Sequence, residues 1–302
     1  MKDKKEQLGM LYVILSGILF GTMPLLAKIA YAHGSNAYSV AFVRFLSGTI
    51  LLFIITMLLP GCKVKIGKEE AKEIIKLSFF YALAPILLYL TYNYMDSGMA
   101  TTLHFTYPVT VILLRAVFLK KGVDFNQTFC TILCVGGIAL LYTPNGRVSI
   151  QGILIAVVSG IIYAVYIVLL GDSKVKAMHP LVLSSWVALF STIEIGIIAV
   201  CTGNLVLEVG VAGWISEIAM GVLGTVLALA LFQKGLFLCG DVKASLLSSF
   251  EPLTGIVIGM IAFQERLNAK EMAGVSAIIL ATILLVAPAL LAKESKRAQK
   301  NK

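Results

Sequence analysis

The amino-acid sequence predicts an all-α integral membrane protein of ten transmembrane helices, arranged as two inverted-topology repeats of five helices each. Three observations lead to this prediction. Apolar residues make up 59% of the 302-residue chain and charged residues only 14%, with a mean hydropathy of +0.92. The apolar residues recur in long runs, and the first half of the chain resembles the second. Because a soluble domain has about 25% charged residues, this chain lacks the charges of a water-exposed surface.

Each apolar run is close to the ~20 residues that a helix needs to cross about 30 Å of hydrocarbon. The connections are short, and none is long enough for a soluble domain. The first run contains Pro24 and Lys28 and is longer than the core of a cleavable signal peptide, so we expect it to be a permanent helix. The ten predicted spans are Leu8–Ala30, Ala37–Leu59, Glu73–Asn93, Met99–Leu119, Gln127–Thr143, Gln151–Leu170, Pro180–Cys201, Trp214–Leu238, Val242–Phe263 and Glu271–Leu291.

The distribution of basic residues predicts the orientation of the chain. It has 25 Lys and Arg against 16 Asp and Glu, a net charge of +9. With the N-terminus inside, the inner segments hold most of these cations, whereas the outer segments hold Arg147, Arg266 and Lys270. Cytoplasmic loops are enriched in Lys and Arg. We therefore expect a multi-pass protein of the cell (inner, cytoplasmic) membrane with both termini in the cytoplasm, and no nucleic-acid partner.

The two halves of the sequence align with each other. Under a shift of 144 residues, Tyr107–Thr110 aligns with Glu251–Thr254, and the register continues without a gap from Ala100 to Pro144. A shift of 143 residues aligns the opening helices. Since five is an odd number, the second half must enter the membrane in the opposite orientation. We expect one repeat over residues 1–146 and the other over 147–302, with a substrate site near the midplane where the halves meet.

Short motifs add a family resemblance to this architecture. They are the Arg44-Phe45 pair early in the second span, the Glu251-Pro252 pair in the ninth, and the Gln264-Glu265-Arg266-Leu267 turn before the last helix. With the two five-helix halves, these motifs make the whole chain resemble the EamA family of the drug/metabolite transporter superfamily. The resemblance implies export or exchange of amino acids, related metabolites or drugs.

Glu251 is the main candidate for a substrate-binding residue. It lies about ten residues into the ninth span, roughly 15 Å along a helix and near the midplane. A carboxylate at that depth must be neutral, paired or next to a water-filled cavity. Pro252 cannot donate a hydrogen bond to the carbonyl of Ser248, so Ser248 and Glu251 are expected to form a polar, locally open patch. Glu251 would contact a substrate amine or carry a coupling proton. The alternative is a structural carboxylate paired with a neighbouring helix.

The fourth span carries an equivalent patch at His104. Pro108 is expected to free the carbonyl of His104, as Pro252 frees that of Ser248. With an ordinary pKa of about 6.5, a midplane histidine could bind substrate or transfer a proton. The alternative is a hydrogen-bonded packing residue. We expect Pro108 and Pro252 to act as paired hinges.

Tyrosines and one glutamine complete the predicted substrate site. Tyr81 and Tyr89 share one stripe of the third span at helical spacing, where they can stack on a solute and donate hydrogen bonds. Tyr163 in the sixth span is a further candidate. Gln233 in the eighth span is the repeat equivalent of Tyr89 and is expected to make a second polar contact.

Five other polar residues have less specific interpretations. Arg44 is expected to be a structural partner for carbonyls or a carboxylate, with substrate contact as the alternative. The sequence offers no explanation of Glu194. Lys28 and Glu217 lie near predicted helix ends, where their side chains can extend to the surface. Tyr92 fits either the site or an interfacial aromatic belt.

The predicted function is that of a secondary transporter, most simply an exporter of small polar metabolites such as amino acids, working by alternating access around a midplane cavity. A passive facilitator or exchanger of other metabolites or drugs is the alternative. The expected partners are the lipid bilayer, a small-molecule substrate and, as a candidate coupling ion, the proton. An enzyme is a remote alternative because the sequence has no HExxH, GxSxG or His/Cys cluster, and we expect no cofactor or metal. A non-transporting receptor or scaffold would be expected to carry a polar domain.

Overall fold

The computed structural model describes residues 2–60, 64–118, 125–141, 149–264, 268–281 and 283–284. All regular structure in these ranges is helical, which confirms the all-α prediction. Residues 269–281 form a last helix. The elements before it are α1 (Lys2–Gly21), α2 (Met23–Ala32), α3 (Ala37–Leu58), α4 (Lys68–Thr91), α5 (Ser97–His104), α6 (Tyr107–Phe118), α7 (Phe125–Leu141), α8 (Ile150–Asp172), the 3₁₀ turn η1 (Lys174–Ala177), α9 (Pro180–Cys201), α10 (Val211–Met220), the π-helix η2 (Gly221–Ala228), α11 (Leu229–Cys239), α12 (Asp241–Leu247) and α13 (Phe250–Ala262).

The predicted spans correspond to these elements, and several spans are interrupted. The first combines α1 and α2, the fourth α5 and α6, the eighth α10, η2 and α11, and the ninth α12 and α13. Seven helical stretches of the described chain are long and apolar enough to cross a membrane. Residues 269–281 fall within the tenth predicted span. The predicted span ends Leu119, Thr143 and Leu291, and the loop cations Arg147 and Arg266, lie outside the described residues.

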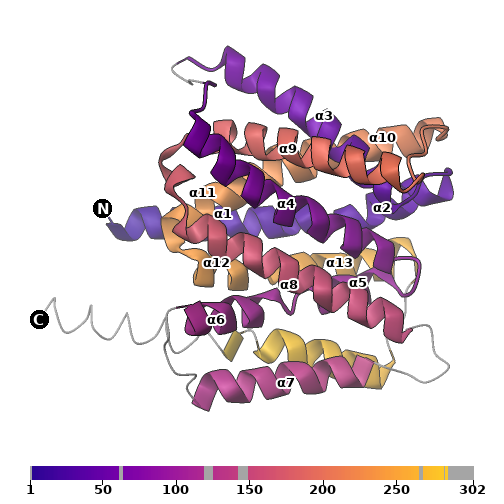
Figure 1. Ribbon diagram of the computed structural model, residues 1–302. Helices are drawn as coiled ribbons and strands as arrows, with labels where there is room; N and C mark the ends of the chain where they lie inside the picture. Colours follow the sequence, from indigo (N-terminus) through magenta and orange to yellow (C-terminus); the bar gives the residue numbers. More distant parts are fainter. Residues whose placement is uncertain are drawn as a thin grey trace, which may run out of the picture.

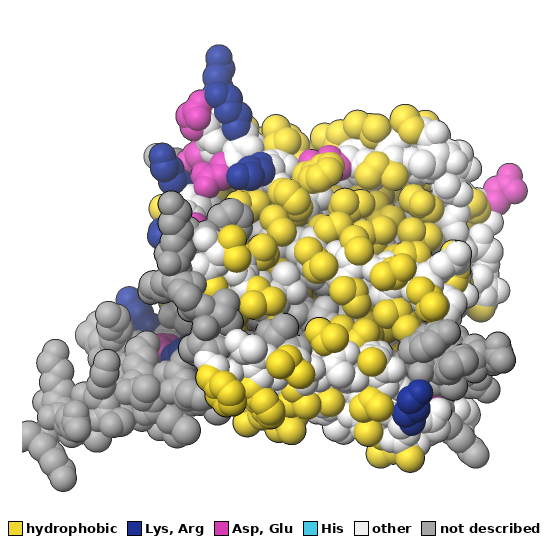
Figure 2. All heavy atoms as spheres, turned by 60° about the horizontal axis from the view of Figure 1, so that its bottom comes forward, with side chains coloured by type: hydrophobic (Ala, Val, Ile, Leu, Met, Phe, Trp, Pro, Cys, Tyr) yellow, Lys and Arg dark blue, Asp and Glu magenta, His cyan; other side chains and the backbone are white. Residues whose placement is uncertain are grey.

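The helices lie side by side in a layered bundle (Figure 1). One end of the bundle, here called the basic end, holds the start of α1, the start of α4 and η1, with Lys4, Lys68 and Lys174. Figure 2 shows a broad hydrophobic flank, with most of the visible Lys and Arg side chains toward the basic end. Large apolar side chains such as Met57 and Val117 are 69% and 71% exposed. Such a flank is suited to lipid rather than to water.

Helix packing repeats when the two halves are exchanged. α1 packs along α11 and α4 along α8, so the first span of each half contacts the third span of the other. The two second spans, α3 and α9, pack against each other, and the hydroxyl oxygens of Thr49 and Thr192 lie 3.1 Å apart between them. These two threonines are equivalent under the 143-residue shift. A residue pair that maps onto itself is expected on the pseudo-two-fold axis.

Two hydrogen bonds repeat in the same way. The hydroxyl of Ser16 donates to the carbonyl of Ala228 over 2.8 Å, and that of Ser159 donates to the carbonyl of Ala84 over 2.7 Å. The shifts of 143 and 144 residues convert one bond into the other. The two inverted repeats predicted from the sequence are therefore present in the packing.

The contacts divide six spans into two equivalent groups. The first bundle consists of α4, α5–α6 and α8, and the second consists of α11, α12–α13 and α1. α3 packs against α9 and η2, and α9 packs against α4, so the second spans lie between the two bundles. The bundles also meet directly where α13 packs on α5.

The fourth and ninth spans break at equivalent positions. α5 ends at His104 and α6 begins at Tyr107, while α12 ends at Leu247 and α13 begins at Phe250. Pro108 and Pro252 follow within the first turn of the next helix, where a missing N–H costs little. The predicted free carbonyl at Ser248 is wrong, because it accepts a hydrogen bond from the N–H of Glu251 over 2.8 Å. The tight turn at the break supplies the donor that Pro252 lacks.

Glycines bring the broken ninth span close to the first. A Cβ on Gly17 would lie 3.3 Å from the backbone nitrogen of Glu251, and one on Gly21 would lie 2.7 Å from its carbonyl oxygen. Gly160 takes the place of Gly17 in the other half, and a Cβ there would lie 3.0 Å from the hydroxyl of Thr106. Gly17 and Gly21 therefore form a helix-packing surface that positions Glu251.

Candidate functional site

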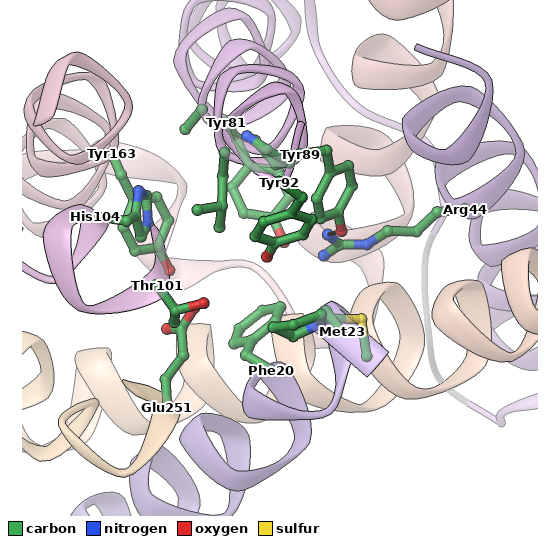
Figure 3. A pocket seen from close by; sticks show the side chains of 14 residues that line it. Phe20, Met23, Arg44, Tyr81, Tyr89, Tyr92, Thr101, His104, Tyr163 and Glu251 are labelled. Atoms are coloured by element: carbon green, nitrogen blue, oxygen red, sulfur yellow. Dashed lines mark hydrogen bonds between the residues drawn. The ribbon is translucent and has the colours of Figure 1, made fainter. Parts of the chain in front are cut away.

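A cavity of about 40 Å³ lies among the broken helices. One buried water needs roughly 10–15 Å³, so the cavity has room for only a few waters in this state and must widen to admit a metabolite. Six of the ten predicted spans supply side chains, from both halves of the chain (Figure 3). The 14 lining residues are Phe20, Met23, Pro24, Arg44, Tyr81, Ala84, Pro85, Leu88, Tyr89, Tyr92, Thr101, His104, Tyr163 and Glu251.

Local structure explains why polar groups reach this cavity. Met23 and Pro24 begin α2 just after the interruption of the first span at Thr22. α4 continues through Pro85 and presents Tyr81, Tyr89 and other residues at helical spacing. Arg44 lies about two turns into α3 and Thr101 about one turn into α5. The cavity therefore lies between the middle of the bundle and the end opposite the basic end.

Arg44 is a buried cation on one side of the cavity. It is 3% exposed, and its Nη1 donates to the hydroxyl of Tyr89. Its guanidinium carbon lies 5.0 Å from the ring centre of Phe45 and 5.7 Å from that of Phe20. These rings attract the cation and limit its movement. Nε of Arg44 has no hydrogen-bond partner among the described residues, so the guanidinium retains capacity to bind a further acceptor.

Glu251 faces the cavity from the opposite side. Its side chain comes from the first turn of α13, is 8% exposed, and points toward Thr101 and His104 in Figure 3. Ion pairs among the described residues occur at Lys72–Glu69, Arg115–Asp172, Arg115–Asp241 and Lys243–Glu6. Neither Glu251 nor Arg44 takes part in one. The cavity therefore has a donor-rich side and an acceptor-rich side.

His104 and Tyr163 form the wall beside Glu251. Nδ1 of His104 lies 2.9 Å from the hydroxyl oxygen of Ser159 on α8. The ring of His104 lies 5.5 Å from that of Tyr163, and Tyr107 lies 4.9 Å from Tyr163 in an edge-on arrangement. The histidine ring is therefore held in place by α8. The hydrogen bond at Nδ1 fits the interpretation of His104 as a packing residue. The position of His104 in the cavity wall fits a substrate contact as well.

Aromatic rings and ion pairs close the route from the cavity to the basic end. The ring of Tyr166 lies 4.8 Å from that of Tyr81 in a tilted arrangement and is fully buried, as is Tyr107. Closer to the basic end, Arg115 pairs with Asp172 at 2.9 Å and also with Asp241. The second pair connects α6 of the first bundle with α12 of the second. This state is closed toward the basic end.

Five of the seven residues predicted to bind substrate line the cavity, namely Glu251, His104, Tyr89, Tyr81 and Tyr163. Ser248 and Gln233 do not line it. The Ser248 hydroxyl donates to the carbonyl of Ala244 over 2.9 Å. The Gln233 amide accepts from Ser184 over 2.8 Å and donates to Tyr166 over 3.2 Å, and its side chain is fully buried.

The structure also revises the less specific interpretations. Glu217 does not extend to the surface: it is fully buried and accepts a hydrogen bond from the hydroxyl of Ser35. Glu194, which the sequence left unexplained, accepts a hydrogen bond from Ser78 over 2.8 Å. The Lys28 ammonium lies 4.7 Å above the ring of Phe263 near a helix end.

The predicted site did not include several residues that line the cavity, among them Arg44, Tyr92, Thr101, Phe20 and Met23. For Arg44 the signal was present, because a cation inside an apolar span is costly and requires a reason. Tyr92 was left between two interpretations, a residue of the site or a member of an interfacial aromatic belt. Phe20, Met23 and Thr101 are ordinary residues of apolar helices, and their role follows only from the helix breaks.

An inverted repeat around a polar cavity is typical of secondary transporters. The model of the EamA-like transporter family matches residues 7–143 and again residues 150–287. The chain therefore belongs to the EamA-like transporter family.

Individual relatives agree with this assignment. An uncharacterized transporter of Archaeoglobus fulgidus is 27% identical over 273 residues, which is 90% of this chain and 94% of that protein. The threonine/homoserine exporter RhtA of Escherichia coli is 25% identical over 256 residues, 82% of this chain and 81% of that protein. One solved crystal structure superposes with a TM-score of 0.68 at 15% identity, covering 94% of this chain and 98% of the other. At that identity the likeness shows the fold alone.

Proposed function

We propose that this transporter exports small polar metabolites such as amino acids by alternating access around the cavity. The observation that carries the proposal is the pair of ionisable side chains of opposite charge type, Arg44 and Glu251, that two different halves of the chain place in one buried cavity. Charged groups at membrane depth are costly and usually mark a transport pathway. The name of RhtA, a threonine/homoserine exporter, is consistent with this substrate class.

Alternating access requires a second state in which the basic end opens. The internal repeat indicates which residues would line the cavity of that state. Under the 144-residue shift, Gln233 is equivalent to Tyr89, Ser248 to His104 and Tyr107 to Glu251. The hydroxyl of Tyr107 is buried without a hydrogen-bond partner in the described chain. We infer that Gln233, Ser248 and Tyr107 line the cavity of that second state, which keeps the first two as substrate contacts.

The orientation and the boundary of the halves belong to the same proposal. We place the basic end and both termini in the cytoplasm of the cell, so that the present cavity faces outward. The concentration of lysines at the basic end supports this placement. We place the boundary of the repeats at residues 146/147, in the interval between the two family matches.

Experiment can distinguish two mechanisms of coupling. If Glu251 alternates between a proton and the substrate amine, export is coupled to proton entry. If Glu251 only contacts the substrate, the protein is a passive facilitator or exchanger of metabolites or drugs. A dependence of the transport rate on pH that disappears when the carboxylate is removed would identify the first mechanism.

The test is transport by purified protein in liposomes preloaded with radiolabelled amino acids. Glu251→Gln keeps the shape of the side chain and removes its charge. Loss of one buried charge-assisted contact, about 1.5–3 kcal/mol, corresponds to roughly 10- to 150-fold. We expect the initial rate to fall at least tenfold while the folded protein is retained.

Glu194→Gln is the matched control, because Glu194 is also a carboxylate within a span but does not line the cavity. It should keep most of the transport rate. The proposal is wrong if wild-type liposomes release no amino acid or related metabolite faster than empty ones. It is also wrong if Glu251→Gln and Glu194→Gln transport equally well.

A further inference from the structure

We propose that the cavity recognises zwitterions, with Arg44 binding the carboxylate of the solute and Glu251 its ammonium group. This inference rests on the proposed function, because it names the substrate class of the same cavity. The two charges line the cavity from opposite sides, Arg44 beside Tyr89 and Glu251 beside Thr101 (Figure 3). The ion pairs found among the described residues include neither of them.

The Arg44 side of the cavity is suited to a carboxylate. Within the described chain, Nε of Arg44 and the hydroxyls of Tyr81 and Tyr92 are buried and have no hydrogen-bond partner. All three groups can donate, and a guanidinium can hold a carboxylate through two parallel hydrogen bonds. The rings of Phe45 and Phe20 and the hydroxyl of Tyr89 already fix the guanidinium. Binding a carboxylate would therefore require little reorganisation of Arg44.

The Glu251 side is suited to an ammonium group. An ionised carboxylate only accepts hydrogen bonds, and an ammonium group supplies three donors. Gly17 and Gly21 hold the backbone of Glu251 against α1, so the carboxylate has a fixed origin. His104 is engaged with Ser159 through Nδ1 and does not provide a fixed cation for Glu251.

Other charge classes fit the cavity less well. A simple anion would pair with Arg44 but bring its charge close to Glu251, and a simple cation would do the reverse. Each would leave one protein charge buried and uncompensated, which is unfavourable in a low-dielectric site. A zwitterion compensates both charges and carries no net charge into the cavity.

The experiment measures thermal stability of the purified wild-type protein in detergent with each of the twenty common L-amino acids, because a ligand that prefers the folded state raises the apparent stability. Affinity for the best stabiliser is then compared with two near-isosteric analogues. One is its 2-hydroxy acid, which lacks the ammonium, and the other is its amide, which lacks the carboxylate. We expect each analogue to bind at least tenfold more weakly than the amino acid.

Variants assign each charge to one end of the ligand. Arg44→Gln should bind the amide and the amino acid with affinities that agree within about threefold, while still discriminating against the hydroxy acid. Glu251→Gln should bind the hydroxy acid and the amino acid with affinities that agree within about threefold, while still discriminating against the amide. Arg44→Lys keeps a cation and should keep a preference for the amino acid over the amide, which covers the case in which Arg44→Gln does not fold. Lys234→Gln and Glu194→Gln, whose side chains do not line the cavity, should match the wild type.

The proposal is overturned if no amino acid stabilises the wild-type protein, if either analogue binds it as tightly as the amino acid, or if both cavity variants lose discrimination against the same analogue. Transport of a singly charged solute that depends on Glu251, without amino-acid binding, would overturn the zwitterion but retain the proposed transport function. Absence of transport for every solute would remove the proposed function itself.

Discussion

Arg44 is stabilised at membrane depth by polarisable neighbours. Three aromatic rings lie within 6.0 Å of its guanidinium carbon, and one tyrosine hydroxyl accepts a hydrogen bond from it. Such contacts favour the charged form without neutralising it. The charge is therefore available to a ligand, in contrast to Arg115, which is paired with Asp172 and Asp241.

At the residue scale, Tyr89→Phe should weaken substrate binding. The change removes the acceptor for Nη1 of Arg44 and keeps the ring beneath the guanidinium. Hydrogen bonds to charged groups contribute about 1.5–3 kcal/mol, so we expect the apparent KM to rise about tenfold or more. Tyr94→Phe is the control, because Tyr94 is 37% exposed and does not line the cavity. Equal KM values for the two variants would show that Tyr89 does not position Arg44.

At the scale of elements, the cavity depends on interrupted helices. The first, fourth and ninth spans each break next to it, and a proline follows each break within the first turn. At each interruption side chains close to the break line the cavity, such as Met23, His104 and Glu251. The unbroken helices α3 and α8 contribute one lining residue each, whereas α4, which continues through Pro85, and its C-cap Tyr92 contribute six.

The hinge role of Pro108 and Pro252 predicts a separation of rate from stability. Replacing either proline with Ala supplies an N–H and favours a continuous helix, so the thermal stability should stay equal or increase. Transport should slow severalfold, and more in the double variant, because the breaks must adjust between the two states. Measurement of initial rates and melting temperatures on the same preparations checks this. Unchanged transport rates in both single variants and in the double variant would exclude a hinge role for Pro108 and Pro252.

At the scale of the whole molecule, the sequence was sufficient for the spans and for part of the site. Apolar runs of ~20 residues predict helices reliably in a membrane, and the 144-residue register predicts the inverted repeat. Glu251, His104 and the tyrosines were identifiable as polar groups within apolar runs. Gln233 was predicted from its repeat equivalence to Tyr89 and Ser248 from the patch beside Pro252, but neither residue lines the cavity in this state. Glu217 was misplaced because distance from a helix end does not reveal Ser35 as its neighbour.

Orientation gives a prediction that labelling can test. In a background without native cysteines, single cysteines at Asn93 and Glu208 should react with an impermeant thiol reagent added to intact cells. Those at Glu69 and Ala177, near the basic end, should react only after the cells are opened. All four side chains are exposed, so access depends on the side of the membrane. The reverse pattern would place the basic end outside.

We expect the two bundles to separate at the basic end during each transport cycle. A Cβ on Gly171 would lie 3.2 Å from the Cβ of Asp241, close to the 3.5–4.5 Å usual in disulfides, and these residues belong to different bundles. A Gly171→Cys/Asp241→Cys protein without other cysteines can therefore be locked by oxidation.

The most direct measurement compares amino-acid transport by this double variant in liposomes before oxidation, after oxidation and after reduction. The Asp241→Cys single variant controls for loss of the Arg115–Asp241 pair, and the Gly171→Cys single variant treated with the oxidant controls for oxidation without a crosslink. We expect transport to fall at least tenfold on oxidation and to return on reduction, while ligand binding to the cavity is retained. Full transport by the crosslinked protein would contradict alternating access.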